Sequence, residues 1–148
     1  MKNWEKGQSL FEVVVAIAIS ALVIISIVSL TTNSISNSTY SKDKALAASY
    51  VQEASEWLRG QRDSDINAFI SHTTTPVWCL KDLSWNVSGS CTDTNYIVNT
   101  KFLRQATFSV TTVNGKNIIE SNVTVSWQDS KGIHDVSGST SLSDWRQK

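Results

Sequence analysis

The chain has 148 residues, of which 41% are hydrophobic and 18% are charged, a balance typical of one folded domain rather than a disordered chain. Thirteen basic and thirteen acidic residues give a formal net charge of zero, which argues against a nucleic-acid groove or a polybasic membrane patch. Two cysteines are too few for a disulfide-rich scaffold, and they lack the short-spaced pairs of a zinc site.

The first long element expected is an apolar helix at Leu10–Leu30, where seventeen of twenty-one residues are apolar. As a helix it would rise about 31 Å, which matches a hydrocarbon core of about 30 Å. A cleavable secretory signal, the alternative, has a shorter apolar core and a small-residue cleavage site, whereas this run ends in Thr31–Ser34. Lys2 and Lys6 precede the run and the next basic residue is Lys42, so we expect a single-pass protein of the cytoplasmic membrane with its N-terminus in the cytoplasm.

Glu12 is the single charge within this run. A carboxylate at the bilayer centre costs about 2.5–3.5 kcal/mol, so Glu12 either reaches the headgroups and water or has a partner. The stretch Lys6-Gly7-Gln8-Ser9-Leu10-Phe11-Glu12, with the apolar run behind it, resembles the type IV prepilin signature. In that signature a short basic leader ends in Gly, is cut there, and is followed by Glu as the fifth residue after the cut.

The resemblance implies how the chain is processed and assembled. A prepilin peptidase would cut between Gly7 and Gln8 and methylate the new amine of Gln8, and Glu12 would pair with the terminal amine of a neighbouring subunit. Other pilin or pseudopilin subunits and a membrane assembly platform with its ATPase would be the further partners. The chain departs from the family at Gln8, where most members have Phe or another hydrophobic residue, and it lacks the proline that many major pilins carry in the hydrophobic helix. Any bend would then come from serine hydroxyls bonded to carbonyls one turn earlier, although the same serines also suit close helix packing; they are Ser20, Ser26 and Ser29.

The helix is expected to continue beyond the apolar run, because neither Gly nor Pro occurs between Leu10 and Gly60. Apolar residues then recur at spacings of three and four, the pattern of an amphipathic helix; they are Ala47, Tyr50, Val51, Ala54, Trp57 and Leu58. An unbroken helix from Leu10 to about Arg62 would reach about 80 Å, and a break at Thr31–Ser41 is the alternative. The stretch Ala45–Asp63 is also similar to minor pilins and pseudopilins, which favours the minor class.

The region Gly60–Pro76 is predicted to be the helix exit and a loop. Asp63-x-Asp65-x-Asn67 resembles the start of a calcium loop, but Ala68 stands where that loop needs Gly, so a solvated turn is the favoured interpretation. His72 and His134 have no neighbours at ligand spacing, and we interpret both as surface residues that bind no metal.

Cys79 and Cys91 lie in the outward part of the chain, where oxidising conditions favour a disulfide that closes a thirteen-residue loop. Two buried thiols are the alternative. Six tryptophans raise the possibility of a ligand-stacking surface, but we favour packing for them. Trp57 and Trp127 fall on predicted buried faces, whereas Trp78, Trp85 and Trp145 remain unassigned.

The last third predicts three consecutive antiparallel strands. The β-branched run Thr107–Val113 leads to the turn Asn114-Gly115, the chain returns through Ile118–Trp127, and a second turn at Asp129–Gly132 precedes the strand Ile133–Leu142. One face of the middle strand is apolar (Val123, Val125 and Trp127), whereas Thr124 and Ser126 alternate with these residues and should face solvent.

Together these patterns predict an α+β protein in which a long N-terminal helix packs on a C-terminal antiparallel sheet of three or more strands. We expect a leader at 1–7, a transmembrane and assembly helix at 8–30, an amphipathic helix at 31–62 and a globular head at 63–148. No catalytic motif is found, so neither an enzyme nor a cofactor is expected. The expected function is that of a structural subunit, a minor pilin or pseudopilin; an uncleaved, membrane-anchored binding or adhesin domain is the alternative.

Overall fold

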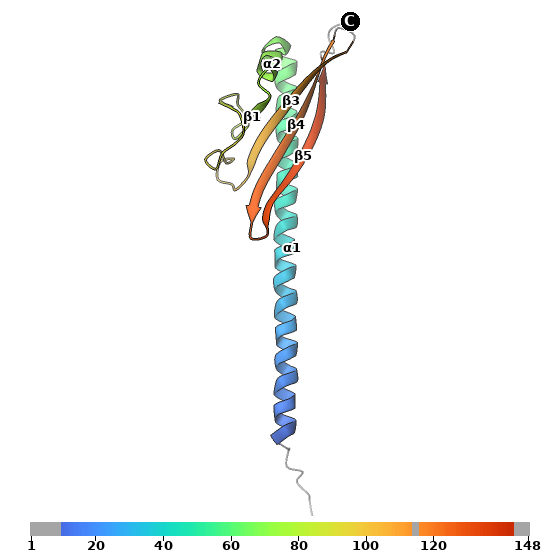
Figure 1. Ribbon diagram of the computed structural model, residues 1–148, viewed down its shortest axis with the longest axis vertical. Coiled ribbons are helices and arrows are strands. Elements are labelled where there is room, and N and C mark those ends of the chain that lie inside the picture. The colour runs from blue at the N-terminus through green and yellow to red at the C-terminus, as the bar shows by residue number, and fades with distance from the viewer. Residues whose placement is uncertain (1–9, 114–115, 144–148) are drawn as a thin grey trace, which may run out of the picture. The chain divides into compact units, whose positions relative to one another are not determined.

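The computed structural model describes residues 10–113 and 116–143, and the chain divides into two compact units, residues 1–42 and 43–148. The elements are two helices followed by five strands (Figure 1): α1 (Leu10–Ser64), α2 (Ile66–Thr73), β1 (Val77–Cys79), β2 (Val87–Ser88), β3 (Leu103–Val113), β4 (Lys116–Asp129) and β5 (Gly132–Ser143). All described residues of the first unit belong to helix α1, and the C-terminal part of the same helix is the first element of the second unit.

Helix α1 passes through Thr31–Ser41 without a break, so the predicted continuous helix is confirmed. Serine and threonine are weak helix formers because their hydroxyls compete for backbone groups. Here the hydroxyls bond within the helix itself, since Thr31 Oγ1 donates to the Ile27 carbonyl (2.9 Å) and Thr32 Oγ1 to the Val28 carbonyl (3.0 Å).

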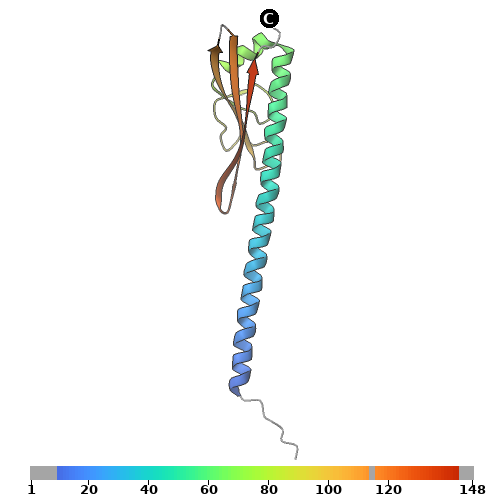
Figure 2. The same cartoon turned by 90° about the vertical axis from the view of Figure 1, so that its right-hand side faces the viewer.

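In the second unit, the C-terminal part of α1 packs on one face of the sheet, which confirms the α+β prediction (Figure 2). The predicted apolar stripe is the contact surface: Ala47, Ala54 and Leu58 are fully buried, and Val51 is nearly so. The alanines leave room for the sheet to approach the helix, while Leu58 fills the core.

The sheet has five antiparallel strands in the order β2-β1-β3-β4-β5. The three predicted C-terminal strands are confirmed as β3, β4 and β5; the turn at Asn114-Gly115 lies outside the described residues. The second predicted turn is also confirmed, because β4 and β5 meet there at the pair Asp129↔Gly132. Gly132 has φ +128°, a backbone conformation that favours glycine. Strands β1 and β2 were not predicted, because three and two residues are too few to show an alternation.

Strand β4 supplies the centre of the core. Val123 and Val125 are fully buried, Trp127 is 2% exposed, and Thr124 and Ser126 on the other face are only partly covered. The predicted alternation of this strand is therefore confirmed.

The prediction of a loop throughout Gly60–Pro76 is wrong. Helix α1 continues to Ser64, and the short helix α2 follows. The carboxylate of Asp65 caps α2 by accepting hydrogen bonds from the N–H groups of Asn67 and Ala68, both at 3.0 Å. The solvated-turn interpretation missed this cap, a role for which aspartate is strongly preferred. Phe69 then fixes the helix by burying its ring in the core.

Candidate functional site

The N-terminal part of α1 presents an apolar surface that nothing in its own unit covers. Leu10, Phe11 and Leu30 are 83%, 74% and 70% exposed, and the other large apolar side chains of this stretch are also largely exposed. Among the described residues, α1 is the one helix long and apolar enough to cross a membrane, with a mean hydropathy of 3.0 over its most apolar window. Soluble monomers rarely expose so much contiguous apolar surface.

Glu12 lies in the first turn of α1 and is exposed. It borders a shallow depression along one helix face, whose other residues are Val13, Ala16, Ile17, Ser20, Ala21 and Ile24. Ala16 and Ser20 follow Glu12 at intervals of four residues, so small side chains lie directly above the carboxylate. Such a face allows a second helix to approach closely. Within the described part of the chain, no hydrogen bond or ion pair involves Glu12.

The serines of this segment bond to their own helix. Ser20 Oγ donates to the Ala16 carbonyl and Ser26 Oγ to the Leu22 carbonyl, each at 2.8 Å, so the predicted back-bonding is confirmed for both. Their hydroxyls therefore add little unsatisfied polarity to an apolar environment. Gly7 and Gln8 lie outside the described residues, and cleavage and methylation there stay predictions.

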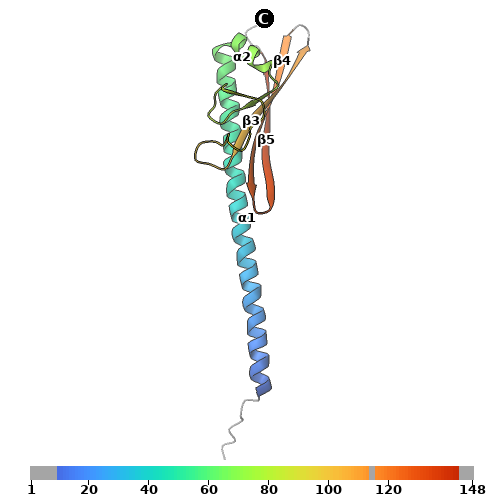
Figure 3. The same ribbon diagram turned by 60° about the vertical axis from the view of Figure 1, so that its left-hand side comes forward.

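In the head, Cys79 and Cys91 form the predicted disulfide, with their Cα atoms 4.9 Å apart. The bridge joins β1 to the irregular segment that precedes β3. Figure 3 shows this segment as a looping trace before β3. The next residue, Leu80, donates its N–H to the Arg104 carbonyl (2.8 Å). The disulfide loop is thus fixed to the sheet on both sides of Cys79.

Arg104 is a buried cation that the sequence interpretation missed. Its side chain is 2% exposed, yet its hydrogen-bond partners Leu80, Tyr50 and Glu53 lie far away along the chain. Nε donates to the Leu80 carbonyl (2.9 Å), and Nη1 donates to Glu53 Oε2 (2.6 Å) and to the Tyr50 carbonyl (3.4 Å). Arg104 therefore joins α1, β3 and the segment after β1. The sequence could have indicated its burial, because Arg104 lies on the same face of β3 as the buried residues Ala106 and Phe108.

The aromatic residues of the head form a cluster around Trp85. Its ring lies 4.8 Å from that of Trp57 and 5.2 Å from that of Trp78, and it stacks on His72 at 4.5 Å with an interplanar angle of 6°. The packing prediction is confirmed for Trp57, Trp78 and Trp85, whereas Trp145 lies outside the described residues. The interpretation of His72 as a surface residue is only partly right, because its ring is half-buried within this cluster.

His134 is also partly buried, and its Nε2 lies 3.0 Å from Asp129 Oδ1. The same oxygen accepts the backbone N–H of Lys131 at 2.7 Å. The backbone hydrogen bond from Lys131, followed by the bond to His134, lowers the pKa of Asp129. This is a turn-stabilising pair between β4 and β5. In residues 10–113 and 116–143, no three His, Cys, Asp or Glu side chains gather closely enough to hold a metal ion.

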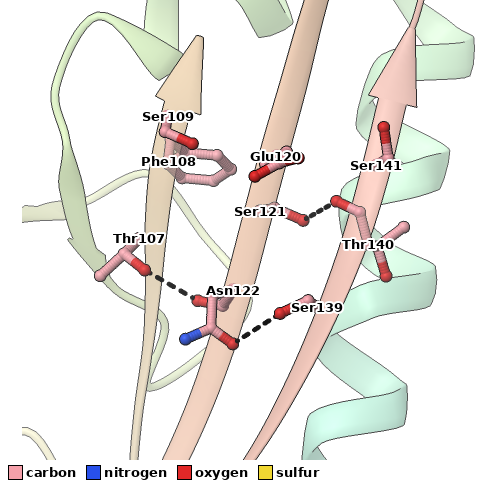
Figure 4. Close-up of a pocket in the computed structure, with 9 residues that line it drawn as sticks. All are labelled: Thr107, Phe108, Ser109, Glu120, Ser121, Asn122, Ser139, Thr140 and Ser141. Carbon is pink, nitrogen blue, oxygen red and sulfur yellow. Dashed lines mark hydrogen bonds between the residues drawn. The ribbon is translucent and has the colours of Figure 1, made fainter. Parts of the chain in front are cut away.

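The outer face of the sheet carries a row of polar side chains across β3, β4 and β5 (Figure 4). Thr107 Oγ1 donates to the Asn122 carbonyl and Ser139 Oγ donates to Asn122 Oδ1, both at 3.3 Å. Glu120 is the one charged residue lining the hollow at this face, which has a volume of about 480 Å³. The hollow contains neither His nor Cys, so it offers no pairing of a nucleophile with a histidine base.

No family model, curated protein or solved structure matches the chain. The architecture itself is pilin-like, because one long helix carries an exposed apolar segment and then packs on an antiparallel sheet.

Proposed function

We propose that the chain is a structural subunit, a minor pilin or pseudopilin, of a type IV pilus or a type II secretion-like filament. The observation that carries the proposal is the difference in exposure between the two parts of α1. Its N-terminal part exposes apolar residues that the chain's own core does not use, and its C-terminal part is buried by the sheet. A helix of this kind can attach a folded head to a lipid or protein environment without disturbing the head.

In this proposal the apolar segment has two successive environments. Residues 10–30 hold the precursor in the cytoplasmic membrane with the head outside, and they later pack against like helices in a periplasmic or extracellular filament. The small-residue face beside Glu12 suits the second environment, because association between apolar helices depends on close packing. Prepilin peptidase, the assembly platform and other pilin subunits are the proposed partners; neither nucleic acid nor a catalytic activity belongs to the proposal.

Glu12 provides the specificity of assembly. An ionised carboxylate among apolar helices is costly unless it is paired, and the amine created by cleavage before Gln8 supplies a positive charge. If that amine comes from a neighbouring subunit, only one axial offset between the two helices satisfies both charges. Burial of apolar surface would then drive assembly, and the charge pair would set its register.

Processing is tested by intact mass and N-terminal sequencing of the protein from its native membranes. The expected mature chain starts at Gln8 and carries an added methyl mass. A chain that still starts at Met1, in cells shown to contain active prepilin peptidase, would contradict the pilin assignment and support the uncleaved, membrane-anchored binding domain.

The pairing role is tested by Glu12→Ala, with Glu120→Ala as the matched control. Glu120 is an exposed glutamate on the outer face of the head. We expect Glu12→Ala to insert into the membrane at the normal level and to be absent from filaments, whereas Glu120→Ala is incorporated normally. Normal incorporation of Glu12→Ala would refute the pairing mechanism.

A further inference from the structure

The two edges of the sheet differ in a way that packing of the head does not require. At one edge lies β2, with two residues, and at the other lies β5, with twelve. Figure 1 shows β5 along one side of the sheet, next to β4. Among the described residues, no backbone hydrogen bond reaches Gly132–Ser143 except those of the β4–β5 ladder. A long edge with unpaired N–H and C=O groups is a template for another strand.

Strand β5 also lacks the features that usually protect such an edge. Its pairing with β4 is continuous from Gly132 to Ser143 and contains no bulge. The strand has no proline, lysine or arginine, and its outward side chains are mostly small; they are Ile133, Asp135, Ser137, Ser139, Ser141 and Ser143. An incoming backbone therefore meets little steric hindrance and a single carboxylate.

The inner side of β5 borders a groove against α1, entirely within the second unit. Val136, Gly138 and Thr140 face the helix but remain partly exposed, whereas Val123 and Val125 of the neighbouring strand are fully buried. The groove has a volume of about 430 Å³ and lies between the edge residues Gly138–Thr140 and one side of α1; the helix residues are Val51, Gln52, Ser55, Glu56 and Arg59. The strand edge thus has an open channel beside it.

We propose that β5 accepts an extended segment of a different protein, another subunit of the assembly, which adds a sixth strand to the sheet in this groove. The unpaired backbone groups select an extended polypeptide, because only a strand presents N–H and C=O groups at the matching spacing. On the helix side, Glu56 and Arg59 form an exposed ion pair that offers both charges to polar side chains of the incoming strand.

A second copy of this chain is a poor occupant. The other sheet edge that the structure describes is β2, which is too short to complement twelve residues. In a filament or membrane, where the α1 helices run in the same direction, the β5 strands also run in the same direction. Two β5 edges would therefore pair only in parallel, which is less stable per residue than antiparallel pairing. This step rests on the proposed function.

Amide hydrogen exchange tests the proposal on the full-length chain. One sample is the assembly isolated from the native host, and the other is the same chain purified in micelles. Alternate amides of residues 132–143 should exchange about tenfold more slowly in the assembly, because each gains a strand hydrogen bond. Gln52→Trp fills the groove from α1 and should return these rates to those in micelles, whereas Ser64→Trp, at the exposed end of the same helix, should not. Ser139→Lys is a second blocking variant, because lysine on an edge strand opposes pairing.

Equal exchange in the two samples would overturn the proposal, and so would protection that survives both blocking variants. Protection that appears in micelles and grows with protein concentration would show self-pairing and overturn the choice of partner. The N-terminal mass of the same sample separates this proposal from the proposed function. A chain starting at Gln8 without protection of β5 overturns strand addition alone, whereas a chain starting at Met1 with protection supports strand addition and overturns processing as a pilin.

Discussion

Replacing Glu53 by Gln removes the charge that faces the buried guanidinium of Arg104 while keeping the shape of the side chain. The two partners differ in exposure, because the side chain of Arg104 is 2% exposed and that of Glu53 is 52% exposed. Hydrogen bonds to charged groups contribute about 1.5–3 kcal/mol. Since half of the Glu53 side chain already contacts solvent, we expect the lower end, a loss of about 1.5 kcal/mol in the free energy of unfolding.

The variant Arg104→Met shows whether that loss belongs to the pair. It leaves the Leu80 carbonyl without its side-chain donor, at a cost of about 1–3 kcal/mol, but it leaves no buried charge, and Glu53 turns to water. Adding Glu53→Gln to Arg104→Met should therefore cost almost nothing. The coupling energy of the double-mutant cycle should be about 1.5 kcal/mol, well above the 0.3–0.5 kcal/mol within which independent sites add.

The measurement is urea unfolding of the full-length chain in a mild non-ionic micelle, followed by near-ultraviolet circular dichroism of the tryptophans. Comparison of midpoints is valid if the denaturant slope is unchanged among the variants. Glu56→Gln is the matched control, because its partner Arg59 is 45% exposed and the same substitution should cost less than about 0.5 kcal/mol. Additive effects of Glu53→Gln and Arg104→Met would refute the assigned ion pair.

Three further predictions concern the head and use the same unfolding measurement. Gly138→Ala should destabilise it by about 1–3 kcal/mol, because the added Cβ would lie 2.7 Å from Cγ1 of Val51, and an unchanged urea midpoint would contradict that close approach. Replacing both Cys79 and Cys91 by Ser should lower the free energy of unfolding by about 3 kcal/mol, because the thirteen-residue loop is no longer closed in the unfolded chain. Reducing agent should leave the stability of the double variant unchanged. Equal stability of variant and wild type would contradict this account. The hydrogen bonds at the β4–β5 turn lower the pKa of Asp129 in the folded chain below its ordinary value of 3.8. The ionised carboxylate therefore stabilises the folded head above pH 3.8, and this contribution is lost as the pH falls through the folded-state pKa. Unfolding of wild type and Asp129→Asn from pH 5 to pH 2.5 should show their difference shrinking, and a constant difference would refute this role.

Local sequence patterns were sufficient for the main elements. The helix Leu10–Ser64 follows from a long stretch without Gly or Pro and from apolar spacings of three and four. The strands β3, β4 and β5 follow from β-branched residues, alternation and turn residues. The Cys79–Cys91 bridge followed from the expected compartment and a short separation along the chain. Each of these signals lies within a window of a few to about twenty residues, which is why one sequence could reveal it.

Local patterns were thus enough to predict an apolar helical segment, its amphipathic continuation and a C-terminal antiparallel sheet, and they include the leader signature on which the proposed function depends. The partners of Arg104, which are 51 residues away at Glu53 and 24 residues away at Leu80, and the stacking of His72 on Trp85 became visible in the folded chain alone. The same is true of β5 as the long edge of the sheet among the described residues. The physical reason is that periodicity specifies which face of an element is buried, whereas a contact between distant residues exists only after the elements have packed.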